Sequence, residues 1–83
     1  MTHRIDFFCG EEDEPLFLTL EPEGMLFQVR DGVEITFVAS SDDPEFKWAF
    51  RYVKAYDSML IYPTSSQYVP VEVYENSVLV YET

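Results

Sequence analysis

Short apolar segments recur along the whole chain, separated about every ten residues by acidic, glycine or proline positions. This spacing is typical of many short β-strands joined by turns. Within most segments the apolar positions alternate, so that one face of each strand would be buried. The predicted strands cover residues 4–8, 16–20, 25–30, 33–38, 46–53, 59–62, 69–74 and 78–81.

The clearest local prediction is a β-hairpin that joins residues 25–30 to residues 33–38. Apolar side chains occupy alternate positions on both sides of Asp31-Gly32. An Asp-Gly pair between two such segments favours a two-residue hairpin turn, because both residues tolerate a positive φ. We therefore expect these two strands to pair directly with each other.

A second hairpin is predicted at the C-terminal end of the sequence. Valines alternate with other residues over 69–74, residues 75–77 turn the chain, and residues 78–81 return. Pro70 has no N–H group to donate to a neighbouring strand. Its strand is therefore expected at the edge of a sheet, or with Pro70 facing solvent.

Residues 43–54 allow two predictions. Asp43 followed by Pro44 is typical of a helix start, and a helix would gather three basic side chains on one face. A helix would also leave much aromatic surface in contact with water, whereas aromatic residues suit a pleated sheet. We predict a strand, which places four aromatic residues on one face: Phe46, Trp48, Phe50 and Tyr52.

These elements predict an all-β fold, a seven- or eight-stranded antiparallel meander that forms a small sandwich or barrel. The alternative is an α+β fold, in which an antiparallel sheet carries one helix at about residues 44–55. A chain of 83 residues has room for one hydrophobic core. Residues 1–83 are therefore expected to form a single domain.

The order of predicted elements between Gly24 and Val73 resembles that of small bacterial pleckstrin-homology-like domains. The predicted hairpin, the strand at 46–53 and the strand at 59–62 carry this resemblance. That family closes with an amphipathic helix, whereas residues 78–81 are predicted here to form a strand. No functional residue is transferred from the family to this chain.

Acidic residues outnumber basic residues by 16 to 5, which gives a formal net charge of −11. Nucleic acids and anionic membranes are bound through clustered Lys and Arg, so we expect neither as a direct partner. A partner recognised through charge is expected to be a basic protein surface.

No segment has the length of a membrane span or the pattern of a secretory signal, and a single cysteine, Cys9, suits a reducing compartment. The expected location is the cytoplasm.

The sequence offers little material for catalysis. His3 and Cys9 are the only residues of their types, and His3 lies near the N-terminus, where it is expected to be mobile. Structural zinc and a histidine-activated nucleophile are therefore excluded in practice, and no glycine-rich phosphate loop is present. Acidic pairs are abundant, but a domain this small is not expected to have a deep cleft for them. We expect a protein that is not an enzyme and has no catalytic, cofactor-binding or metal-ligating residue.

Two acidic runs and several tyrosines are the candidate partner-contact residues. Acidic loops can favour encounter with a basic partner, and tyrosines often anchor interfaces. Each set also has a simpler interpretation, since acidic turns are usually solvated and tyrosines usually pack between strands. The candidate residues are Glu11, Glu12, Asp13, Glu14, Asp42, Asp43, Glu45, Tyr52, Tyr68 and Tyr74.

The sequence thus favours a small, acidic, non-catalytic module that binds a partner protein through acidic loops and exposed tyrosines. The alternative is an inhibitor that mimics nucleic acid and blocks a DNA- or RNA-processing enzyme, which requires carboxylates in one continuous stripe. A third hypothesis is self-association through an edge strand, near Pro70 or in the C-terminal hairpin.

Overall fold

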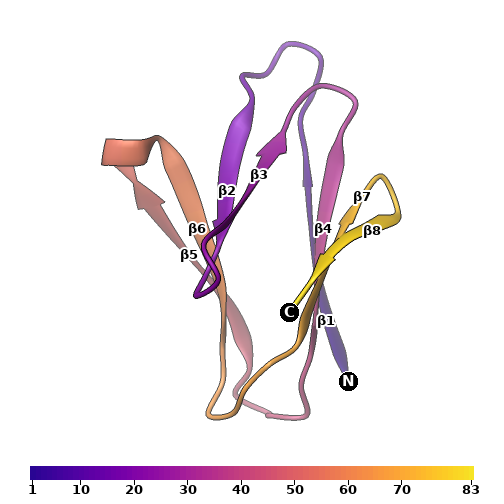
Figure 1. The fold of residues 1–83 in the computed structure, drawn as a ribbon, viewed down its shortest axis with the longest axis vertical. Helices are drawn as coiled ribbons and strands as arrows, with labels where there is room; N and C mark the ends of the chain where they lie inside the picture. The colour runs from indigo at the N-terminus through magenta and orange to yellow at the C-terminus, as the bar shows by residue number, and fades with distance from the viewer.

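The computed structural model describes residues 1–83 and consists almost entirely of β-strands (Figure 1). The all-β prediction is confirmed, and the α+β alternative is wrong. One short 3-10 helix, η1 (Lys54–Tyr56), joins two of the strands. The strands are β1 (Thr2–Phe8), β2 (Leu16–Leu20), β3 (Met25–Val29), β4 (Glu34–Ser40), β5 (Lys47–Val53), β6 (Ser58–Thr64), β7 (Val71–Glu75) and β8 (Val78–Glu82).

The strands form two four-stranded sheets. Sheet 1 has the order β1-β4-β7-β8, and sheet 2 has the order β3-β2-β6-β5. All neighbouring strands are antiparallel except β2 and β6, which are parallel. The chain changes sheet in the β1–β2 and β3–β4 connections at the upper end of Figure 1, and in the β4–β5 and β6–β7 connections at the lower end. The small sandwich is confirmed, but its strands do not follow one another as in a simple meander.

Residues 25–30 and 33–38 do not form the predicted hairpin, because β3 and β4 belong to different sheets. A turn is present, in which the N–H of Val33 donates to the carbonyl of Arg30 at 2.9 Å. Of its two central residues, only Gly32 has a positive φ, of 77°. A single positive φ at this position is typical of a type II turn, which splays the flanking strands. The turn was predicted correctly, but it leads the chain from one sheet to the other.

The C-terminal hairpin is confirmed, because β7 and β8 pair across Asn76 and Ser77. Both turn residues have positive φ values, 49° and 69°, which suit the twist of paired strands. Of the two positions expected for Pro70, the sheet edge is wrong, since β7 lies between β4 and β8, and the solvent-facing position is confirmed. Pro70 precedes β7, faces solvent, and accepts a hydrogen bond from the N–H of Ser40 through its carbonyl.

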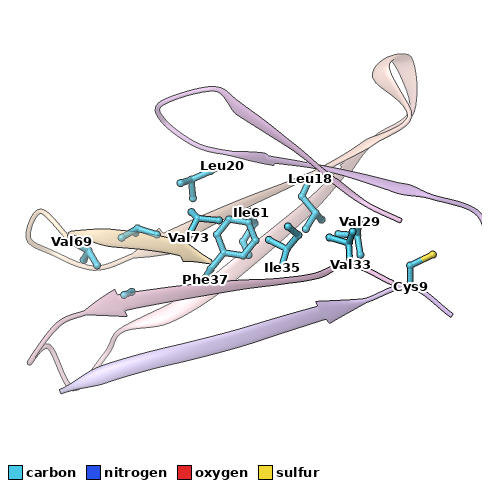
Figure 2. Packing of buried hydrophobic residues seen from close by; sticks show 12 residues of the cluster. Cys9, Leu18, Leu20, Val29, Val33, Ile35, Phe37, Ile61, Val69 and Val73 are labelled. Carbon is cyan, nitrogen blue, oxygen red and sulfur yellow. The ribbon is translucent and has the colours of Figure 1, made fainter. Parts of the chain in front are cut away.

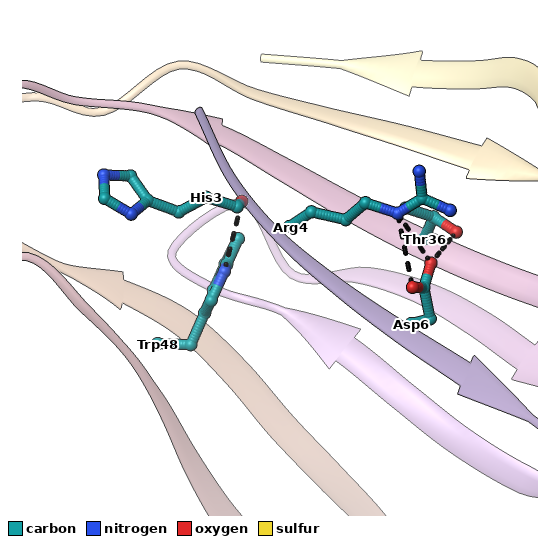
Figure 3. Close-up of polar contacts among 5 residues, drawn as sticks. All are labelled: His3, Arg4, Asp6, Thr36 and Trp48. Carbon is teal, nitrogen blue, oxygen red and sulfur yellow. Dashed lines mark hydrogen bonds and ion pairs between the residues drawn. The ribbon is translucent and has the colours of Figure 1, made fainter. Parts of the chain in front are cut away.

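The strand predicted for the aromatic segment is confirmed as β5. The indole N–H of Trp48 donates to the carbonyl of His3 at 3.3 Å (Figure 3). The rings of Phe50 and of Phe7 on β1 form an edge-to-face contact, with ring centroids 5.9 Å apart. The aromatic face of β5 therefore packs against the opposite sheet at Trp48 and Phe50, while Tyr52 is 55% exposed and the other face of the strand points outward.

The hydrophobic core is a cluster of twelve buried residues between the two sheets (Figure 2). Phe37 of β4 is completely buried, and its ring contacts those of Phe7 and Phe27. On β2, Leu18 and Leu20 are also completely buried. Each such side chain stabilises the fold by about 1.5–3 kcal/mol, which fixes the face that β2 presents to the core. The alternate residues of β2 are consequently left on the outer face of sheet 2.

Residues 78–82 form a strand, β8, as predicted, and not an amphipathic helix of the kind found in pleckstrin-homology-like domains. The helical part of the fold is limited to η1. No helix present has the length and apolar character needed to cross a membrane.

Candidate binding surface

The outer face of sheet 2 carries a groove that encloses about 530 Å³. Some of its apolar walls are open to solvent, since Leu26 is 58% exposed and Tyr56 is 78% exposed. Binding sites are typically concave, mostly apolar and about 300–1,000 Å³ in volume. The groove therefore has the size and lining of a binding site. Its apolar residues each come from a different element: Phe17 (β2), Leu26 (β3), Val53 (β5), Tyr56 (η1) and Leu60 (β6).

The strand register explains why these side chains meet. Thr19 of β2 pairs with Leu26 on one side and with Leu60 on the other. Two residues earlier on β2 and β6, Phe17 pairs with Ser58. Because every second residue of a strand shares a face, these side chains all project outward from sheet 2.

The polar groups at the floor of the groove bond to one another. The hydroxyl oxygens of Thr19 and Ser58 lie 3.1 Å apart, and the Ser58 hydroxyl donates to the carbonyl of Phe17 at 3.2 Å. No buried side-chain polar atom of the protein lacks a partner. At the β2–β3 turn, no atom lies within 4 Å of the position that a Cβ on Gly24 would take, so this end is open. An occupant of the groove would therefore be held mainly by apolar contact.

Charges are unevenly placed around the groove. Glu21, at the end of β2, is the charged residue in the groove lining, and no hydrogen bond or ion pair within the chain holds its carboxylate. On the opposite side, Arg51 of β5 pairs in register with Leu60. Neither Arg51 nor its neighbours Lys47 and Lys54 have a carboxylate within ion-pair distance. The groove thus has one carboxylate in its lining, near the β2–β3 turn, whereas the unpaired bases lie outside the lining, on β5 and at the start of η1.

The acidic run Asp42, Asp43 and Glu45 lies in the β4–β5 loop at the lower end (Figure 1). One carboxylate oxygen of Asp43 accepts hydrogen bonds from the Ser65 hydroxyl at 2.8 Å, the Ser66 N–H at 3.1 Å and the Ser66 hydroxyl at 3.2 Å. Its other oxygen accepts from the N–H of Glu45 at 2.9 Å. These bonds, first those from the backbone of Glu45 and Ser66, lower the pKa of Asp43 to about 2.

Asp42 is also engaged within the chain. Its carboxylate accepts a hydrogen bond from the N-terminal amino group at 2.8 Å, which lowers its pKa. Both partners are well exposed, so this pair contributes little to stability. Of the three acids in this loop, Glu45 is the one whose carboxylate is free for a partner.

The other acidic run lies in the β1–β2 loop, at the upper end (Figure 1). Within it, the Asp13 carboxylate accepts a hydrogen bond from the N–H of Gly10 at 3.1 Å. The glutamates are exposed and form no hydrogen bond or ion pair through their carboxylates. The run leads into β2, where Phe17 lines the groove. The two acidic runs therefore lie at opposite ends of the molecule, and the run continuous with the groove consists of Glu11, Glu12, Asp13 and Glu14.

The exposed tyrosines predicted as contact residues do not form one surface. Tyr52 lies near the end of β5 and donates a hydrogen bond to Asp57 at 2.8 Å, which raises the pKa of its phenol. Tyr68 lies in the β6–β7 loop, where its hydroxyl donates to the Thr83 hydroxyl at 3.0 Å. The tyrosine that lines the groove is instead Tyr56.

Tyr74, the third predicted tyrosine, is half-buried on the outer face of sheet 1. Burial raises the pKa of its phenol, and the charges of Glu72 and Glu82 raise it further. These two glutamates occupy opposite positions on the neighbouring strands β7 and β8. This face is therefore acidic where the face of sheet 2 is apolar.

A polar network on the same face joins β1 to β4 (Figure 3). Asp6 accepts a hydrogen bond from the Thr36 hydroxyl, and its two carboxylate oxygens share the single Nε–H of Arg4, at 3.1 and 3.2 Å. The Thr36 bond is the main cause of the lowered pKa of Asp6. Because these groups satisfy one another, the network acts as a structural link between the two strands.

The two residues best suited to catalysis or metal binding are held by the fold. His3 was expected to be mobile, but the fold holds it in place. Its ring stacks on Phe46 with centroids 4.1 Å apart, and its Nε2 donates to the Ser41 carbonyl at 3.1 Å. Cys9 is buried and unpaired, and burial raises the pKa of its thiol. No group of three His, Cys, Asp or Glu side chains converges where it could hold a metal ion.

Sequence reasoning missed the groove, although the sequence contains an indication of it. Phe17 occupies a position that should face outward, between the inward-facing leucines of β2. Leu26 and Leu60 likewise stand between apolar neighbours, so neither strand alternates with polar residues. Strands that are apolar on both faces are typical of sheets covered on both sides. Here that second face is uncovered within the chain.

No protein-family model matches the chain, and no curated protein sequence or solved structure matches it either. The groove, the free acidic side chains and the unpaired cations therefore carry the functional argument by themselves.

Proposed function

We propose that the protein is a non-catalytic binding module that docks a partner protein on the outer face of sheet 2. The groove on this face is the observation that carries the proposal. It gathers apolar side chains from five elements, two of them more than half exposed, around a floor whose polar groups are already paired. Exposed apolar surface of this kind is typical of interaction sites.

The partner is expected to be basic near its contact surface. The chain has a net charge of −11, and the carboxylates of Glu11, Glu12 and Glu14 are free. Such charges increase the encounter rate and the specificity of binding more than its strength. The apolar groove would supply the contact area. The buried, unpaired Cys9 supports a reducing location such as the cytoplasm.

A nucleic-acid mimic would need carboxylates along one continuous stripe. The two longest acidic runs stand at opposite ends of the sandwich, and Asp42 and Asp43 are bound within the chain. No observation therefore favours the mimic over the binding module.

Self-association remains a separate proposal for strand β8. β8 is an edge strand of sheet 1, and three successive apolar residues on it are exposed: Val78, Leu79 and Val80. Unprotected edge strands of this kind can pair with a second chain. Sedimentation equilibrium over a range of concentrations tests this, and a strict monomer would exclude it.

The binding module is tested by comparing which proteins are captured by matched variants. Leu26→Ser and Tyr56→Ser change exposed side chains of the groove, so both are expected to fold normally. Phe8→Ser changes an exposed apolar residue on the other sheet, outside both the groove and β8, and is the control. We expect a partner bound by the wild type to be lost with the groove variants and kept with the control. A partner that is kept by both groove variants would refute the proposed site.

A further inference from the structure

We infer that the groove takes an extended segment of the partner in which an apolar side chain fills the groove and a nearby Lys or Arg pairs with Glu21. This inference rests on the proposed function and specifies the chemistry of its partner. It depends on where one unpaired acid, Glu21, and two unpaired bases, Arg51 and Lys54, lie relative to the apolar groove.

The apolar part of the segment is specified by the groove walls. Phe17 and Leu26 form one side, while Val53 and Leu60 form the other. The floor between them is made of Thr19 and Ser58, whose hydroxyl groups are paired. An aliphatic or aromatic side chain seated there would cover exposed apolar surface without leaving a polar group unpaired.

The basic residue of the segment is specified by Glu21. This residue is half-buried, lines the groove and has its backbone N–H bonded to the Ile61 carbonyl at 3.0 Å. Its backbone is thus anchored, while its carboxylate has no partner within the chain. A cation is therefore the complementary group at this end of the groove.

The bases along β5 set the orientation of the segment. Arg51 lies beside Leu60, and Lys54 follows the end of the same strand. A cation on the segment is repelled by these residues and attracted by Glu21, on the opposite side of the groove. The missing side chain of Gly24 leaves that end open, so a chain can continue past Glu21.

The apolar residue and the basic residue of the segment are expected two positions apart. In an extended chain, residues i and i+2 project from the same side and lie about 7 Å apart. A segment with an apolar residue at i and a basic residue at i+2 can therefore place both side chains toward sheet 2.

The test uses three blocked pentapeptides titrated into ¹⁵N-labelled protein and followed by NMR. The sequences are Gly-Leu-Ser-Lys-Gly and its two analogues, with norleucine or glutamate in place of lysine. We expect the lysine peptide to shift the amide signals of Thr19, Leu26 and Leu60. It should bind about 1.5- to fivefold more tightly than the norleucine peptide, the range of an exposed ion pair. The glutamate peptide should bind most weakly.

Two variants locate the preference for a cation. Glu21→Gln should make the lysine and norleucine peptides bind equally well, while Glu23→Gln, in the same turn but outside the groove lining, should keep the difference. Equal binding of all three peptides to the wild type would overturn the inference, as would shifts confined to the acidic loops. If partner capture depends on Leu26 and Tyr56 while the peptides show no preference for lysine, the proposed function stands and this inference fails.

Discussion

The two acidic loops at opposite ends of the sandwich look alike in sequence but serve different purposes. In the β4–β5 loop, Asp43 bonds to residues of the β6–β7 loop and ties together two of the connections between the sheets. In the β1–β2 loop, Glu11 and Glu12 bond to nothing in the chain. One acidic run therefore helps to hold the architecture, and the other is available to a partner.

The two loops differ because hydrogen-bond donors from elsewhere in the chain surround the carboxylates of only one of them. Ser65 and Ser66 place two hydroxyl groups and a backbone N–H around Asp43. The nearest backbone donor used in the upper loop is the N–H of Gly10, and Asp13 takes it. An excess of acidic residues is thus not by itself a measure of available charge, because donors from distant parts of the chain can engage some of it.

The largest expected effect is that of Asp43→Ala. It removes the acceptor of four hydrogen bonds and leaves the β4–β5 and β6–β7 loops unlinked. We expect the melting temperature to fall by on the order of 10 °C. Glu12→Ala is the matched control and should leave it within about one degree, since exposed positions of this kind rarely affect stability. Equal melting temperatures for the two variants, measured by circular dichroism, would remove the contrast between the loops.

The second prediction concerns acid unfolding. The pKa of Asp43 is about 2 in the fold, against an ordinary value of 3.8, so the unfolded chain takes up this proton more readily than the folded chain. The stabilisation is therefore complete above the ordinary pKa and is lost as the pH falls from about 5 to about 2. Asp43→Asn lacks this titration, so its deficit in stability relative to the wild type should shrink over that range. Denaturant unfolding at several pH values measures it, and a constant deficit would contradict the assigned role of the carboxylate.

The existence of the strands could be predicted from sequence much better than their pairing. Alternation of apolar residues depends on neighbours in sequence, and all eight segments form strands. Pairing depends on the conformation of a turn. The turn before Val33 has one positive φ and separates its strands, while the turn at Asn76-Ser77 has two and joins them. Asp-Gly permits both conformations, so the sequence alone could not decide between them.

The candidate site could be predicted only in part, for a similar reason. The acidic runs are visible as composition, but the engagement of Asp43 depends on serines more than twenty positions away. The groove depends on β2 and β6 lying in parallel, which brings Phe17 beside Ser58. Parallel neighbours distant in sequence leave no local pattern, and the apolar outer positions were the one indication available.

A smaller effect is expected at Asp6, an acid engaged less extensively than Asp43. Thr36→Val removes the hydroxyl that donates to Asp6 but keeps the shape of a buried side chain and the Arg4 contacts (Figure 3). We expect a loss of about 0.5–1 kcal/mol in the free energy of unfolding, measured with urea. Thr2→Val, on the same pair of strands but without a side-chain hydrogen bond, should cost less. A larger loss in the Thr2 variant would show that the hydroxyl of Thr36 is not what matters.

The smallest effect on stability, and the most informative for function, is expected from replacing Glu11, Glu12 and Glu14 together by Gln. Their carboxylates are free, so the melting temperature should not fall, and removing three like charges from a chain of −11 should if anything raise it slightly. Once a partner is identified, surface plasmon resonance should show slower association with the triple variant and a weaker dependence on salt, while dissociation changes little.

The control for the triple variant is Asp42→Asn, because it removes a charge at the far end of the molecule that already has a partner. If the control slows association as much as the triple variant does, net charge alone attracts the partner and the position of the β1–β2 loop is irrelevant. If only the triple variant slows it, the acids of that loop guide the partner, because they lead into the strand that forms the groove.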